Sequence, residues 1–83
     1  MHIIIYTKSG CPWCTDALAF LQKNHIEFEE REVRANSTYF DELIQKSGQE
    51  KTPTFDIDGE ILADSDVDQI KDYLLKRGVL HDV

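Results

Sequence analysis

Cys11-Pro12-Trp13-Cys14 is the stretch of sequence that decides the fold, and it holds the only two cysteines of the chain. It follows a short apolar run, His2-Ile3-Ile4-Ile5-Tyr6, and it opens a stretch with helical periodicity. A C-x-x-C pair between a strand and a helix is typical of a redox dithiol, because two thiols at this spacing can close a disulfide and reopen it. The sequence therefore predicts thiol–disulfide chemistry at the start of the first helix.

Cys11 is the candidate nucleophile of this pair. At a helix N-terminus the free N–H groups and the helix dipole favour an anion, and the nearby Lys8 adds positive potential. Such a setting lowers a cysteine pKa from about 8.5 to roughly 3.5–7.5, and the thiolate is the form that attacks a disulfide. Cys14, one helical turn further on and more buried, would resolve the mixed disulfide. The alternative is a pair of buried structural thiols.

Pro12 and Trp13 separate the two cysteines and are expected to support the site. Proline is favoured in the first turn of a helix, where its missing N–H costs nothing. Trp13 is expected to be partly exposed, as a contact surface for a partner, because indoles are seldom fully buried. The alternative for Trp13 is a place in the core.

Length and composition predict one small domain over residues 1–83. A disulfide between cysteines this close would constrain little of the unfolded chain, so a purely structural disulfide is the weaker interpretation. Hydrophobic residues make up 41% of the chain, enough for an ordinary core. The sequence shows neither a signal-peptide pattern nor a run of about 18 apolar residues. We therefore expect a cytoplasmic protein that makes no contact with a membrane.

The net charge is −7 and it is unevenly distributed. Residues 1–25 sum to +1, whereas residues 26–83 sum to −8. No cluster of Lys and Arg offers a footprint for phosphates, so we expect no nucleic-acid partner. The acidic surface is expected to serve solubility or to attract a basic partner. We expect the protein to be a monomer.

The order of apolar and turn-forming residues predicts four strands and three helices. The strands are expected over residues 3–6, 26–33, 54–57 and 60–62, and Asp58-Gly59 is a strong hairpin signal between the last two. The first helix is expected over residues 12–24. This β-α-β-α-β-β-α order predicts an α/β fold with a small mixed sheet flanked by the helices.

The second and third helices are recognised by their ends. Residues 36–38 offer N-caps for the second helix, Gly48 offers its C-cap, and its inward stripe is expected to consist of Phe40, Leu43, Ile44 and Ser47. Asp64 or Ser65 is expected to cap the third helix, which would bury Val67, Ile70 and Leu74 and end at Gly78.

The sequence resembles a glutaredoxin of the thioredoxin fold over nearly its whole length, to about residue 78. The likeness rests on the element order, on Tyr6-Thr7-Lys8-Ser9-Gly10-Cys11-Pro12-Trp13-Cys14, on the second helix, and on the later Thr52-Pro53. Dithiol glutaredoxins typically carry C-P-Y-C, and here Trp13 replaces the tyrosine with another aromatic. The resemblance implies an enzyme that reduces protein disulfides or glutathione mixed disulfides. It implies no bound cofactor, with glutathione or another low-molecular-weight thiol as reductant.

The resemblance also implies a glutathione or substrate site made of Lys8, Lys51, Thr52, Pro53, Ser65 and Asp66. Pro53 resembles the family's cis-proline, which would leave the Thr52 backbone free to pair with an extended substrate. Asp66 and the Ser65 backbone match the place where the family holds the γ-glutamyl end of glutathione. The alternative interpretation of Pro53 is a trans proline that only starts a strand. The alternative for Asp66 is that it only caps the helix.

Three positions depart from the family's pattern. Lys51-Thr52-Pro53 stands where T-V-P is usual, and Ala63-Asp64-Ser65-Asp66 stands where Gly-Gly-x-Asp is usual. Phe40 stands where many members carry a basic or amide side chain near the glycine carboxylate of glutathione. We expect Lys8 and Lys51 to offset that loss in part.

Two other functions remain open. One is a glutaredoxin-like thioredoxin that a thioredoxin reductase re-reduces and that serves ribonucleotide reductase, which the changes at residues 63–66 and Phe40 favour. The other is a non-catalytic module that binds a metal or an iron–sulfur cluster. The ligand count argues against zinc, because there is no second cysteine pair and the histidines are scattered.

Overall fold

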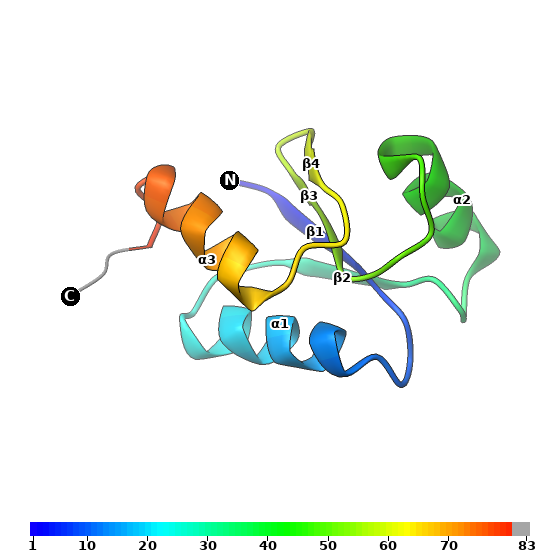
Figure 1. Cartoon of the computed structure of the whole chain (residues 1–83), viewed down its shortest axis with the longest axis horizontal. Coiled ribbons are helices and arrows are strands. Elements are labelled where there is room, and N and C mark those ends of the chain that lie inside the picture. The colour runs from blue at the N-terminus through cyan, green and yellow to red at the C-terminus, as the bar shows by residue number, and fades with distance from the viewer. Residues whose placement is uncertain (81–83) are drawn as a thin grey trace.

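Residues 1–80 are described by the structure, a computed structural model, and they form three helices and four strands in the predicted order (Figure 1). The strands are β1 (Ile3–Thr7), β2 (Glu29–Glu32), β3 (Thr54–Ile57) and β4 (Glu60–Leu62). The helices are α1 (Pro12–Lys23), α2 (Ser37–Ser47) and α3 (Val67–Lys76). The expected α/β architecture is therefore confirmed.

The strands form a mixed sheet of order β2-β1-β3-β4. β1 is parallel to β2 and antiparallel to β3, and β3 is antiparallel to β4. The register sets Tyr6 opposite Thr54, at the end of β1 and the start of β3. The segments that follow β1 and precede β3 therefore lie side by side at one edge of the sheet, and they are the segments that carry Cys11 and Thr52-Pro53.

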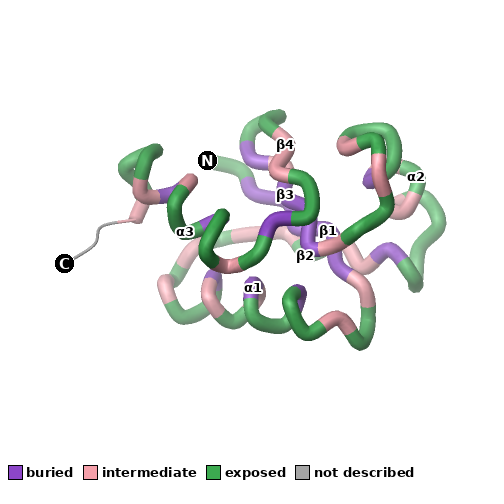
Figure 2. Tube along the Cα trace, viewed as in Figure 1, coloured by how far each residue is buried: buried purple, intermediate pink, exposed green. Residues whose placement is uncertain are grey.

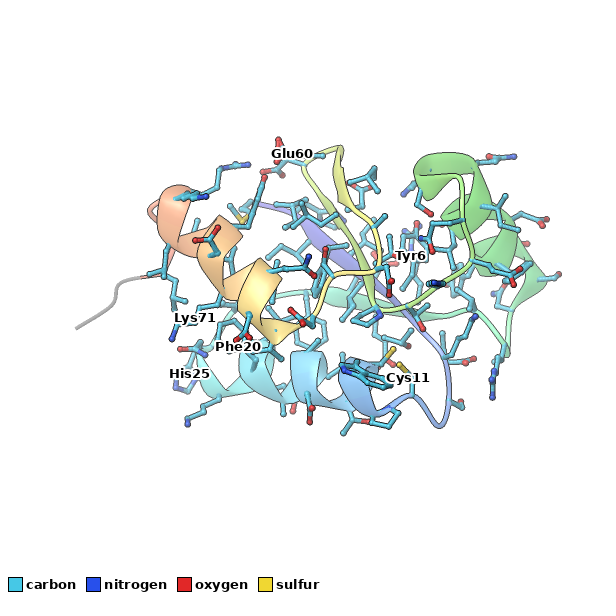
Figure 3. The ribbon with its side chains drawn as sticks, in the orientation of Figure 1. Tyr6, Cys11, Phe20, His25, Glu60 and Lys71 are labelled. Atoms are coloured by element: carbon cyan, nitrogen blue, oxygen red, sulfur yellow. The ribbon has the colours of Figure 1, made fainter. Side chains whose placement is uncertain are left out.

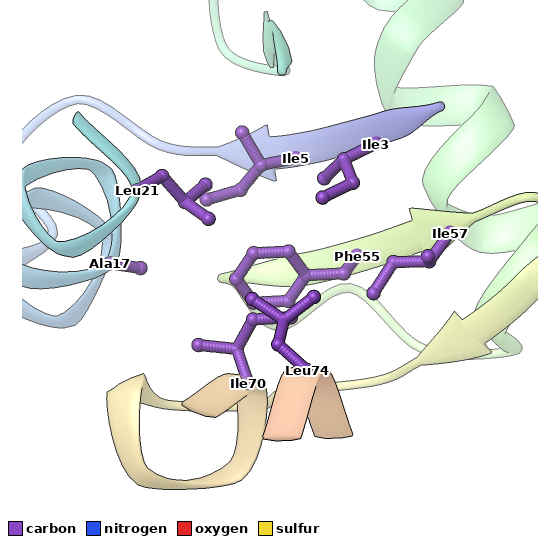
Figure 4. Close-up of a cluster of buried hydrophobic side chains, with 8 residues drawn as sticks. All are labelled: Ile3, Ile5, Ala17, Leu21, Phe55, Ile57, Ile70 and Leu74. Carbon is purple, nitrogen blue, oxygen red and sulfur yellow. The ribbon is translucent and has the colours of Figure 1, made fainter. Parts of the chain in front are cut away.

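Alternation along the central strands sends apolar side chains to both faces of the sheet. Ile3 and Ile5 of β1 join Phe55 and Ile57 of β3 in one buried cluster with Ala17 and Leu21 of α1 and Ile70 and Leu74 of α3 (Figure 4). Ile4 and Tyr6 point the other way, into a smaller cluster with Val33, which follows β2, and with Leu43 of α2. The buried parts of the chain thus concentrate in β1 and β3, between α1 and α3 on one side and α2 on the other (Figure 2).

The hairpin and the end of α2 are as expected. Asp58 and Gly59 have φ angles of 52° and 91°, the left-handed values that a tight turn between β3 and β4 requires. Gly48 ends α2 in the left-handed conformation and donates its N–H to Ile44. Asn36 is the residue that caps the start of α2, through its side-chain oxygen.

The second strand is shorter than expected. The sequence predicts residues 26–33, whereas β2 covers only Glu29–Glu32. The backbone N–H of Ile26 still bonds to Leu21 of α1 at 3.0 Å, and His25 has a φ of 56°, so the end of the helix occupies these residues. Ile26 and Phe28 instead pack against the larger cluster.

The prediction that Asp64 or Ser65 caps α3 is wrong, because Asp66 is the N-cap. Asp66 accepts the N–H of Gln69, and the Gln69 side chain accepts the N–H of Asp66, which completes a capping box. Asp64 has a φ of 50°, and buried Ser65 donates its N–H to Pro53 at 2.8 Å. Because the N–H of Ser65 is bonded to Pro53, α3 begins only after Ser65, with Asp66 as its cap.

The expected inward stripe of α2 is only partly right. Leu43 is buried, but Ile44 is 41% exposed. Glu42 and Lys46 face the sheet in its place, since both hydrogen-bond to the buried Tyr6 hydroxyl. Figure 3 shows Tyr6 between the sheet and α2. Among the described residues, no helix is long and apolar enough to cross a membrane.

Candidate active site

Cys11 is held at the junction of β1 and α1. β1 ends at Thr7, and a short loop follows in which Gly10 takes a φ of 82°. The N–H of Cys11 bonds back to the Lys8 carbonyl at 3.2 Å, which closes the loop. Cys11 is itself the N-cap residue of α1 (Figure 3). Pro12 occupies the first turn, as the sequence predicts.

Hydrogen bonds converge on the sulfur of Cys11 from two segments. The backbone N–H of Cys14 donates to it at 3.2 Å. The hydroxyl of Thr52 lies 3.8 Å from the same sulfur, and the Thr52 carbonyl accepts from the Cys11 thiol at 3.9 Å. Thr52 thus offers an acceptor to the thiol and a donor to the thiolate.

The two thiols differ in acidity. Burial raises the pKa of Cys11, but hydrogen bonds from the side chain and backbone of Cys14 and from Thr52 outweigh it, and the pKa lies below its usual 9.0. Burial and the hydrogen bond to Cys11 raise the pKa of Cys14 to about 11. Cys14 is only 2% exposed, whereas Cys11 is partly accessible. Cys11 is therefore the thiol suited to attack, and Cys14 is the thiol that stays protonated.

Thr52 and Pro53 form the wall opposite α1. The peptide bond between them is cis, and Pro53 is buried while Thr52 is partly accessible. The carbonyl of Pro53 accepts the N–H of Ser65, which ties the segment before α3 to the same edge of the sheet.

A groove of about 600 Å³ surrounds Cys11. Most residues predicted from the sequence line it: Lys8, Cys11, Pro12, Trp13, Lys51, Thr52, Pro53 and Asp66. Trp13 is 62% exposed, as expected for a contact surface. Cys14 and Ser65 do not line the groove, because both are buried.

Sequence reasoning missed Ser9, Gly10, Arg34 and Asp64, which also line the groove. Arg34 follows β2, and the parallel pairing of β1 with β2 brings their carboxyl ends to one edge of the sheet. The signal available for Arg34 was its position as a charged residue shortly after the strand that neighbours β1, the strand that precedes the dithiol. Phe40 lies away from the groove and packs with the smaller apolar cluster.

The opposite charges in the groove come from different segments of the chain. Lys8, Arg34 and Lys51 supply cations, while Asp64 and Asp66 supply carboxylates. An arrangement of this kind suits a ligand that carries both signs of charge. Within residues 1–80, no group of three or more His, Cys, Asp or Glu side chains is placed to hold a metal ion.

Comparison with known proteins gives a consistent result. The Glutaredoxin family model matches residues 3–62. The chain is 32% identical to Glutaredoxin 3 of Escherichia coli (strain K12) over 65 residues, which are 78% of each chain. Among solved structures, a thioredoxin-like protein, BC3987, is 30% identical with a TM-score of 0.78, covering 84% of this chain and 96% of that one. A glutaredoxin from Brucella melitensis is 30% identical with a TM-score of 0.67, covering 98% and 95%.

Proposed function

The chain belongs to the glutaredoxin family of thiol–disulfide oxidoreductases, and from this premise we propose that it reduces protein disulfides and glutathione mixed disulfides with glutathione as its electron donor. The observation that carries the proposal is the position of the Cys11 sulfur. It is partly accessible in a groove lined by three cations and two carboxylates, and its hydrogen bonds favour the thiolate. Glutathione carries one ammonium and two carboxylates around its thiol.

The reaction begins when the Cys11 thiolate attacks one sulfur of the substrate disulfide. The substrate S–S bond breaks, a mixed disulfide with Cys11 forms, and the other substrate sulfur leaves as a thiolate that takes a proton. With a protein disulfide, Cys14 loses its proton and attacks Cys11, which releases the second substrate thiol and leaves a Cys11–Cys14 disulfide. The substrate gains two electrons and the protein dithiol loses two.

Two molecules of glutathione return the protein to its reduced form. The first attacks Cys11, opens the Cys11–Cys14 disulfide and leaves glutathione attached to Cys11. The second attacks the sulfur of the bound glutathione, so that glutathione disulfide departs and Cys11 is released as a thiolate. The high pKa of Cys14, about 11, supports its role as the group that takes a proton in the first of these steps.

The remaining groove residues are assigned to holding glutathione. The Thr52 backbone next to Pro53 would pair with the extended tripeptide. Asp66 would accept from the ammonium of the γ-glutamyl end, while N–H groups at the start of α3 and the Ser65 backbone take its carboxylate. Lys8 and Lys51 would attract the carboxylates. Trp13, exposed beside Cys11, would contact the protein that carries the disulfide.

A comparison of electron donors tests this proposal. NADPH is supplied either with glutathione and glutathione reductase or with thioredoxin reductase, and reduction of a mixed disulfide between glutathione and a small thiol is followed through NADPH absorbance. We expect turnover in the first system and none after Cys11→Ser. Absence of turnover with glutathione, or full activity of the Cys11→Ser variant, would contradict the proposal.

A second candidate is a thioredoxin-like role with a thioredoxin reductase as donor, for example in supplying ribonucleotide reductase. It is favoured by Ala63-Asp64-Ser65-Asp66, which lacks the paired glycines, and by the likeness to a thioredoxin-like protein at a TM-score of 0.78. Turnover only in the thioredoxin reductase arm of the experiment would select this candidate. In either role we propose a monomer in the cytoplasm, where a reducing environment keeps the dithiol active.

A further inference from the structure

Basic side chains without an ion pair gather in the groove. The chain has nine Lys and Arg against sixteen Asp and Glu. Within residues 1–80, four of the nine pair with carboxylates: Arg31, Lys46, Lys76 and Arg77. Of the other five, Lys8, Arg34 and Lys51 line the groove. In a protein of net charge −7, three free cations around one reactive sulfur indicate an anionic ligand group.

Arg34 is the outermost of these three cations along the sheet. The order β2-β1-β3-β4 places the segment after β2 at one side of the groove and the segment after β4 at the other. Arg34 follows β2, whereas Asp64 and Asp66 follow β4. Cys11 and Thr52 lie between them, after β1 and before β3. The groove therefore has a cationic end and an acidic end, with the sulfur in the middle.

The loop that carries Arg34 is fixed by its own hydrogen bonds. The carboxylate of Glu32 accepts the N–H groups of Ser9, Arg34 and Ala35, the first two at 2.9 and 3.1 Å. Burial raises the pKa of Glu32, but these backbone bonds outweigh it and hold the pKa below its usual 4.5. Arg34 Nη1 also donates to the Ser9 carbonyl at 3.0 Å. The guanidinium is thus tied to the loop that precedes Cys11.

The single bond from Arg34 Nη1 leaves most of its N–H donors available. A guanidinium presents five N–H groups in a planar fork that matches a carboxylate. Phe40, where many family members carry a basic or amide side chain, packs into the smaller apolar cluster instead. The carboxylate that such a side chain would bind needs another partner, and Arg34 stands at the cationic end of the groove.

We propose that Arg34 determines specificity by binding the glycine carboxylate of glutathione, in place of a basic side chain on α2. This inference rests on the proposed function. Glutathione then lies across the sheet edge with its glycine end toward β2 and its γ-glutamyl end toward α3. A thiol without a carboxylate at the glycine end is a poorer donor to this protein.

The test measures reduction of the Cys11–Cys14 disulfide directly. The oxidised protein is mixed with excess glutathione, or with glutathione whose glycine carboxylate is an ethyl ester, and the fluorescence of Trp13 is followed. No coupling enzyme is needed, since Trp13 is the only tryptophan and lies between the two cysteines. The wild type is expected to react about three- to tenfold faster with glutathione than with the ester, as for one charge-assisted contact.

Arg34→Gln is expected to lose that preference, by slowing with glutathione while its rate with the ester stays the same. Arg34→Lys keeps the charge without the fork and is expected to give an intermediate ratio; it carries the test if the glutamine variant does not fold. Arg77→Gln is the control, because it removes the same charge at the far end of α3.

The outcomes separate the two proposals. No reaction of the wild type with either thiol overturns both the glutathione-dependent function and the role of Arg34. A wild type that reacts with glutathione, together with an Arg34→Gln variant that keeps the wild-type preference or slows equally with both thiols, overturns only the role of Arg34.

Discussion

The sulfur of Cys11 accepts the backbone N–H of Cys14 at 3.2 Å. A free donor of the first turn of α1 is thus satisfied by the sulfur that begins the helix, rather than by a hydroxyl or a carboxylate. A thiolate accepts such a bond more strongly than a thiol, so capping the helix and acidifying Cys11 are one interaction.

Selective alkylation follows from the different acidities of the two thiols. With iodoacetamide near neutral pH, we expect the thiol of Cys11 to be alkylated first. Its pKa lies below the usual value, whereas the pKa of Cys14 is about 11. As pH falls, the rate should decline only when the pH passes the lowered pKa of Cys11. Peptide mass spectrometry after limited reaction identifies the modified residue. Equal labelling of both cysteines would contradict the assignment of roles.

Thr52→Val removes a hydroxyl while keeping the shape of the side chain. The hydroxyl donates to the Cys11 sulfur at 3.8 Å, so its loss is expected to raise the pKa of Cys11 and to slow alkylation at neutral pH about two- to fivefold. Absorbance of the thiolate near 240 nm against pH measures the pKa directly. Thr52→Ser keeps the hydroxyl and should restore most of the wild-type profile. An unchanged pKa in the valine variant would show that the hydroxyl does not tune Cys11.

Local signals predicted most of the fold. Asp58 and Gly59 form the hairpin turn because both adopt a positive φ. Pro12 favours a helix start because proline suits the first helical turn, where its missing N–H costs nothing. The wrong start of β2 also comes from a local signal. The alternation of apolar and charged residues begins at Ile26, but the N–H of Ile26 is still hydrogen-bonded to the end of α1. Periodicity alone did not show where one element stops competing with the next.

Contacts between residues far apart in the sequence could not be predicted from these local signals. Arg34 reaches the groove because β2 lies beside β1 and because Glu32 fixes the loop. The place of Arg34 after a strand was a sequence signal, but the hydrogen bonds of Glu32 that fix the loop are not visible in the residues around it. Glu42 and Lys46 face the sheet because they bond to the Tyr6 hydroxyl, 36 and 40 residues away in sequence. This hydroxyl donates to Glu42 and accepts from Lys46. The apolar stripe predicted for α2 therefore gave only part of the face that the helix turns to the sheet.

Asp66 offers a test that separates helix capping from ligand binding. Asn is as good an N-cap as Asp but carries no charge, whereas Ala provides neither. We expect Asp66→Ala to lower the free energy of unfolding by about 0.5–2 kcal/mol and Asp66→Asn to leave it nearly unchanged. If Asp66 also holds the ammonium of glutathione, both variants should raise the KM for glutathione.

Urea unfolding and steady-state kinetics on the two Asp66 variants provide these values. A KM that rises only in the alanine variant would assign Asp66 to the helix alone. An increase in both, with stability retained in the asparagine variant, would assign it to the groove as well.

The polar cluster under α2 is expected to make stability depend on acid pH. Glu42 accepts the Tyr6 hydroxyl at 2.8 Å and pairs with Arg31, and Lys46 donates to Tyr6 and Asp56 at 2.7 Å each. Burial raises the pKa of Glu42, but its bonds to Tyr6 and Arg31 outweigh it, so the folded pKa lies below the usual 4.5. The stabilisation is therefore complete above about pH 4.5 and is lost as the pH falls through the lowered value.

Glu42→Gln tests this dependence. At neutral pH the variant is expected to lose about 1–2 kcal/mol of unfolding free energy, because a charged acceptor is replaced by a neutral amide beside Arg31. As the pH falls below 4.5 and then through the lowered pKa of Glu42, the difference from the wild type should shrink, since the wild-type carboxylate becomes protonated. Urea unfolding from pH 7 to pH 3 measures both effects, with Glu50→Gln on the exposed surface as the control. A difference that stays constant across this range would mean that the charge of Glu42 does not stabilise the packing of α2 on the sheet.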